Sequence, residues 1–69
     1  MKIFAERIRK LRTEKGISVK ALGKAIGVSG ATIIRWETGN YDTTSKNIVK
    51  LAIYFGVSAN YLLGKDSEY

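Results

Sequence analysis

The placement of glycine constrains the fold of this chain more than any other feature. Five of its seven glycines fall where an apolar helical pattern stops, and the sequence contains no proline. Glycine readily adopts the left-handed backbone conformation that ends helices. The sequence is therefore predicted to form short helices separated by tight turns. The predicted stops are Gly16, Gly27, Gly39, Gly56 and Gly64.

The segments between these stops have a helical period. Phe4, Ile8 and Leu11 recur at i, i+4 and i+7, which predicts an amphipathic helix over residues 2–15. Serine or threonine precedes each later segment and can cap it. The later helices are expected at about 19–26 after Ser18, 30–38 after Ser29, 46–55 after Thr44 or Ser45, and in a short segment after Ser58. No segment is predicted to be a strand, so the expected fold class is all-α with five short helices.

The same period predicts which side chains face inward. The expected core residues beyond the first helix are Leu22, Ala25, Ile26, Ile33, Trp36, Ile48, Leu51, Ala52, Phe55 and Leu62, with Tyr61 as a further candidate. The link between the second and third helices is very short, which favours a helix-turn-helix at a steep angle. We expect Gly23 and Ala25 to leave room there for Ile33 and Trp36.

Composition limits the classes of function. The chain has 69 residues, no Cys and no His, so one domain is expected at 1–64, with a short polar tail at 65–69. Catalytic pairs, thiolate metal sites and phosphate-binding glycine loops are missing from the sequence, so no enzyme, metal or cofactor is predicted. No apolar run approaches the length of a membrane span, and a cytoplasmic location is the default expectation.

Charge points to an anionic partner. The net charge is +6, and residues 1–26 hold eight of the twelve Lys and Arg residues. Such a concentration favours nucleic acid over a membrane surface. The cationic face of the first helix could be a patch for a membrane surface or for phosphates, but we favour an ordinary solvated face.

Four motifs in order resemble those of a known family. They are "RIRKLRTEKGIS", "LGKAIGVS", "TIIRWETG" and "LAIYFGVSANYLLG". Together they resemble the Cro/repressor-type (XRE-like) helix-turn-helix family, whose domains have a lambda-repressor-like fold. The resemblance implies an ion pair between Arg12 and Glu37, and a recognition helix at 30–38 that enters the major groove. Val19 departs from the family pattern, which usually has Gln there to help hold a phosphate.

The resemblance also implies a set of DNA-contacting positions. Arg35 is the strongest candidate reader because a guanidinium can bind guanine O6 and N7 together, and Ala31 and Ile34 can pack on thymine methyl groups. The start of the second helix and the loop after the third are expected to contact phosphates. The predicted DNA-binding residues are Ser18, Lys20, Ser29, Gly30, Ala31, Thr32, Ile34, Arg35, Asn40 and Tyr41.

These features predict a sequence-specific DNA-binding transcriptional regulator, a repressor that acts by occupying its operator. The main alternative is a protein-interaction module of the antitoxin or anti-repressor type that uses the apolar face of the third helix. A membrane-surface peptide is a third, weaker reading. We also expect a homodimer on a pseudo-palindromic operator. Its expected contact patch is Ile53, Tyr54, Tyr61 and Leu63.

Overall fold

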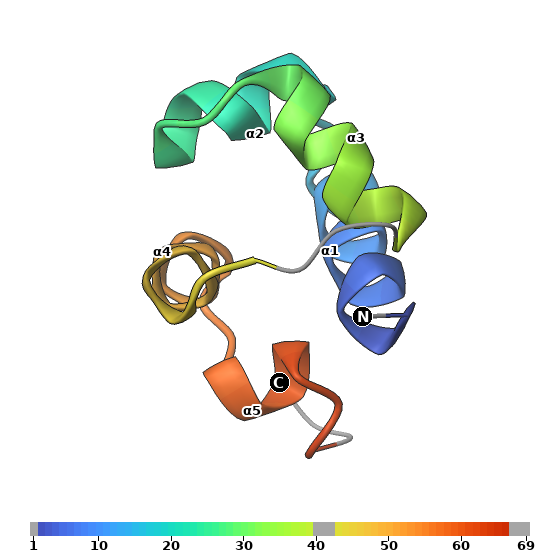
Figure 1. Cartoon of the computed structure of the whole chain (residues 1–69), viewed down its shortest axis with the longest axis vertical. Helices are drawn as coiled ribbons and strands as arrows, with labels where there is room; N and C mark the ends of the chain where they lie inside the picture. The colour runs from blue at the N-terminus through green and yellow to red at the C-terminus, as the bar shows by residue number, and fades with distance from the viewer. Residues whose placement is uncertain (1, 40–42, 67–69) are drawn as a thin grey trace.

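The computed structural model describes residues 2–39 and 43–66, which contain five helices and no strand (Figure 1). The helices are α1 (Lys2–Lys15), α2 (Val19–Ile26), α3 (Gly30–Thr38), α4 (Ser45–Phe55) and α5 (Ala59–Leu62). The predicted all-α class is confirmed, and the second and third helices have the predicted bounds. Within the described ranges, no helix is long and apolar enough to cross a membrane.

Local capping explains where these helices begin and end. The side-chain oxygens of Ser18, Ser29, Thr44 and Ser58 each accept a hydrogen bond from the backbone N–H three residues later. Such a bond satisfies one of the donors that a helix start leaves unpaired. Thr44, rather than Ser45, caps α4. The five predicted stop glycines all have positive φ.

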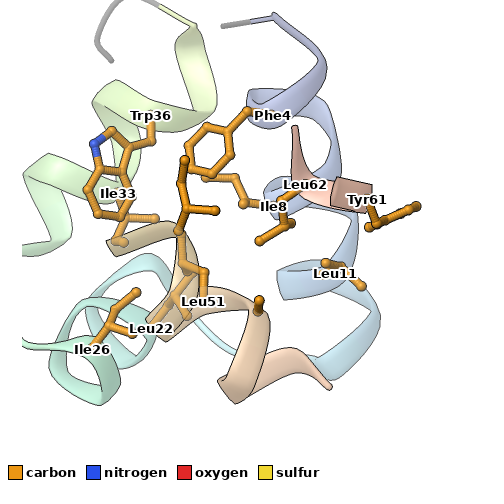
Figure 2. Close-up of a cluster of buried hydrophobic side chains, with 12 residues drawn as sticks. Phe4, Ile8, Leu11, Leu22, Ile26, Ile33, Trp36, Leu51, Tyr61 and Leu62 are labelled. Atoms are coloured by element: carbon orange, nitrogen blue, oxygen red, sulfur yellow. The ribbon is translucent and has the colours of Figure 1, made fainter. Parts of the chain in front are cut away.

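The helices enclose one apolar core (Figure 2). In Figure 1, α2 and α3 meet at the top, α1 runs beneath α3, and α4 lies between α2 and α5. Each helix buries at least one large side chain, and Phe4 packs edge-on against Trp36 with ring centroids 6.1 Å apart. The six most deeply buried large residues are Phe4, Ile8, Leu22, Ile33, Leu51 and Leu62.

The expectation that Ala25 lies in the core is wrong. Ala25 is exposed, because α2 buries Leu22, Gly23 and Ile26 instead. Gly23 leaves room for the turn that follows α2. A Cβ built on Gly23 would lie 2.5 Å from the Val28 carbonyl oxygen, so the close neighbour is the backbone of the turn.

A cation from α1 holds the C-terminal part of the described chain. The Arg7 guanidinium donates hydrogen bonds to the backbone oxygens of Tyr61 and Asp66, the latter at 2.6 Å. Its Cζ also lies 4.2 Å from the centroid of the Tyr61 ring. Tyr61 is therefore 4% exposed, at the edge of the core cluster (Figure 2).

Candidate nucleic-acid interface

The turn between α2 and α3 is closed by backbone hydrogen bonds. The N–H groups of Gly27 and Val28 both donate to the Gly23 carbonyl oxygen at 2.8 Å. Gly27 has a φ of 84°, a backbone conformation that residues with a Cβ rarely adopt. Ser29 then caps α3. Because only residues 27–29 separate the two helices, this turn sets the orientation of α3 relative to α2.

Arg12 and Glu37 form the ion pair that the family resemblance implied. Arg12 Nε lies 2.6 Å from Glu37 Oε2, and Nη2 donates to Oε1 at 3.0 Å. Arg12 Nη1 donates to the Ile17 carbonyl oxygen at 2.9 Å. The hydrogen bond to Glu37 raises the pKa of Arg12, although burial opposes it. The pair joins the end of α1, the turn before α2 and the end of α3.

The two faces of α3 differ sharply. Ile33 and Trp36 are buried in the core, whereas Ala31 and Arg35 are exposed and Ile34 is 50% exposed. Three of the predicted base-contacting residues therefore lie on the outer side of this helix. A cation and apolar side chains at helical spacing can contact base edges in a major groove.

Three of the predicted DNA-binding residues have hydroxyl groups that form hydrogen bonds at the starts of α2 and α3. The Ser18 hydroxyl oxygen accepts from Ala21 N at 3.0 Å, which leaves its O–H able to donate. Ser29 Oγ accepts from Thr32 N at 3.1 Å and lies 3.0 Å from Thr32 Oγ1. If Thr32 donates in that second bond, the exposed Ser29 hydroxyl can donate outward. Thr32 is half-buried and less available than Ser29.

The starts of α2 and α3 lie against each other. A Cβ built on Gly30 would be 3.3 Å from Lys20 Cα and 3.4 Å from Lys20 N. At Gly30 the side-chain direction therefore points toward α2, and the missing side chain lets the two helices approach closely. The exposed Lys20 side chain belongs to the same edge as the start of α3. Asn40 and Tyr41 lie outside the described residues.

A hollow beside Ile34 is lined in part by Arg9, which is not among the predicted DNA-binding residues. Arg9, Arg12, Val19, Ile34, Glu37 and Thr38 line this hollow, which has a volume of about 290 Å³. Arg9 is exposed at its rim. The cationic pattern of the first helix was the available signal, but only the packing of α1 against α3 places Arg9 beside Ile34.

The expected dimer patch is only partly exposed. Ile53 is 76% exposed and Leu63 is 38% exposed, whereas Tyr54 is half-buried. Tyr61 is buried beneath Arg7, so its inclusion in an exposed patch is wrong. Self-association through the remaining residues stays a prediction.

Comparison with known proteins places this geometry in a family. The family model described as helix-turn-helix matches residues 8–62. The chain belongs to the helix-turn-helix family. This family comprises DNA-binding transcription regulators rather than enzymes, in agreement with the sequence prediction.

Named relatives include regulators from phages and prophages. Repressor protein C2 of Salmonella phage P22 is 36% identical over 64 residues, which are 93% of this chain and 30% of that protein. The SPbeta prophage-derived helix-turn-helix-type transcriptional regulator YonR of Bacillus subtilis (strain 168) is 33% identical over 61 residues, 88% of this chain and 56% of YonR. This helix-turn-helix chain thus spans about a third to a little over half of these relatives.

A solved structure has the same fold. The P22 c2 repressor in its crystal structure with a synthetic operator superposes with a TM-score of 0.86 and 36% identity. The match covers 91% of this helix-turn-helix chain and 96% of that one. The arrangement of α1 to α5 therefore matches that of the P22 c2 repressor.

Proposed function

We propose that this chain is a sequence-specific DNA-binding transcriptional regulator that represses by occupying its operator. The observation that carries the proposal is the exposed face of α3, which the α2–α3 turn and the Arg12–Glu37 pair hold outward. The likeness to a repressor solved with an operator supports it. A bound repressor needs no cofactor, since occupancy alone excludes polymerase.

The exposed residues divide into two roles. Arg35 reads a guanine, and Ala31 and Ile34 pack on thymine methyl groups beside it. Phosphate contacts come from the edge formed by the starts of α2 and α3 and from Arg9, which position the protein without reading sequence. The proposed phosphate-contacting residues are Ser18, Lys20, Ser29 and Arg9, together with Asn40 and Tyr41 from the sequence pattern. Gly30 and Thr32 support the start of α3 at this interface.

Two copies are proposed to bind one operator. A single small reading surface gives limited discrimination, and a twofold-symmetric site doubles it. We infer a pseudo-palindromic operator with half-sites about one helical turn, or about 34 Å, apart. The DNA-binding unit is proposed to be residues 1–64, and its place of action the cytoplasm, where bacterial and phage operators are found.

Selection from random duplex DNA at moderate salt tests this proposal. Enrichment of a pseudo-palindrome with guanine at one position of each half-site is expected. Arg35→Ala should then lower affinity for that site by about tenfold to a hundredfold, corresponding to about 1–3 kcal/mol, and should remove the guanine preference. Arg9→Ala is the matched control, since losing a phosphate contact should weaken binding to all sequences alike. A uniform loss with Arg35→Ala would contradict its assignment as a base reader.

The rival proposal is a protein-interaction module that uses the same helix. Its support is the apolar character of the exposed Ala31 and Ile34, whose side chains form no hydrogen bonds. Salt separates the two functions. DNA binding should weaken steeply as salt rises, because phosphate contacts release counterions, whereas an apolar protein contact should not. Salt-independent binding through α3 would favour the rival.

A further inference from the structure

A second exposed surface lies between the end of α2 and the outer side of α4. An open hollow of about 360 Å³ is lined there by Ala25, Ile26, Lys50, Ile53 and Tyr54. None of these residues belongs to the proposed DNA interface, whereas Ile53 and Tyr54 also belong to the dimer patch expected from the sequence. Figure 1 shows α4 and the end of α2 at the left of the molecule and α3 at the right.

All the lining residues of the hollow except Lys50 have apolar or aromatic side chains. Ile53 is 76% exposed, and Val49, one helical turn before it on α4, is 50% exposed. Residues four apart lie on the same helical face, so these two side chains form a stripe beside the hollow. Large apolar side chains that gather on one exposed face mark a contact surface more often than isolated ones do.

The rim of the hollow is cationic. Lys50 lines it, and the exposed Lys46 lies one turn earlier on the same face of α4. Lys15 Nζ lies 5.2 Å from the centroid of the Tyr54 ring, which brings a third cation to the edge. No lining residue is acidic. We propose that this hollow, hereafter the α2–α4 hollow, docks an acidic amphipathic helix of another protein, with its apolar side chains against Ile53 and Tyr54 and its carboxylates near the lysines.

Charge decides between this occupant and the two obvious alternatives. A second copy of the chain, paired about a twofold axis through this hollow, would bury the same patch on both copies, so two sets of Lys46 and Lys50 would come close together with no acidic lining residue to pair with them. Like charges brought together in this way oppose association. A nucleic acid would suit the lysines, but its phosphates would have no favourable contact with the exposed Ile53. An acidic amphipathic helix satisfies both the apolar and the cationic parts of the surface.

The test uses the whole chain without DNA, so its outcome is independent of the proposed DNA binding. The isotope-labelled protein is titrated, by NMR, with a synthetic helical peptide about five turns long that carries leucines on one face and glutamates beside them. Backbone shifts are expected at Ala25, Lys50, Ile53 and Tyr54. The matched peptide with lysines in place of the glutamates should not bind. Shifts confined to α3, or equal binding of both peptides, would overturn the proposal.

Two substitutions sharpen the result. Lys50→Glu should weaken binding of the glutamate peptide by about tenfold or more, whereas Lys65→Glu, the same charge change outside the hollow, should alter it by less than about twofold. Ile53→Asp should also abolish binding, and its unchanged circular dichroism would show that it folds. Sedimentation of the free chain tests the second-copy alternative. A dimer that Ile53→Asp dissociates would assign the hollow to self-association instead.

Discussion

Replacing Glu37 with Gln tests whether the ion pair between α1 and α3 stabilises the fold. Glutamine keeps the shape of the side chain, but Arg12 loses its charged partner. The Arg12 side chain is 15% exposed and the Glu37 side chain is 8% exposed. Removing one member of a fully buried pair costs about 3–5 kcal/mol, and exposed pairs are worth about 0–1 kcal/mol. The partial exposure of Arg12 places the expected loss of unfolding free energy between these ranges, at about 2 kcal/mol.

A loss of this size is readily measured. For a domain of this length it should lower the melting temperature by about 8–16 °C. Thermal and urea unfolding followed by circular dichroism give both quantities. Glu14→Gln, the same change at an exposed position of α1, is the control and should stay within about 0.5 kcal/mol. A double-mutant cycle with Arg12→Met should give a coupling energy of about 1.5 kcal/mol. A coupling near zero would refute the argument, because the pair would then act only as two surface charges.

The pH dependence of this pair has a defined sign. The folded-state pKa of Arg12 is raised, so the stability that its protonated form contributes is complete below the usual arginine pKa and is lost only above it. Between about pH 5 and 9, titration of Arg12 should therefore leave stability unchanged.

Two further substitutions test local parts of the fold. Ser29→Ala removes the cap of α3, which accepts from Thr32 N, and should cost about 1 kcal/mol of unfolding free energy in thermal unfolding without DNA; an unchanged midpoint would contradict this role of Ser29. Arg7→Met removes the guanidinium that binds the backbone oxygens of Tyr61 and Asp66, and should cost about 1–2 kcal/mol and speed hydrogen exchange in α5. Unchanged exchange in α5 would show that the core alone holds that helix.

Some features were predictable because their causes are local. A serine that accepts from an N–H three residues later, and a glycine with positive φ, each act within one turn of the chain. The bounds of α2 and α3 follow from such signals at Ser18, Gly27 and Gly39, and the structure has them as predicted. The choice between Thr44 and Ser45 stayed open because either side chain can cap a helix.

The failures arise where a neighbour far along the chain decides burial. Ala25 follows the same helical period as Leu22 and Ile26. It is nevertheless exposed, because it lines the open hollow between α2 and α4. Tyr61 is an aromatic residue near the end of the chain, and Arg7 of α1 covers its ring. Periodicity within one helix contains no information about either neighbour.

The sequence by itself determined that the chain forms capped helices, where α2 and α3 begin and end, and which side chains of α3 face the core. These properties depend on backbone conformation and on bonds that close within about one helical turn. Only the tertiary structure decided that Arg9 lies beside Ile34, that Gly30 meets Lys20, and that α2 and α4 enclose a cationic hollow. Such contacts depend on how the helices pack around the shared core, because side chains from separate helices become neighbours only when that core forms.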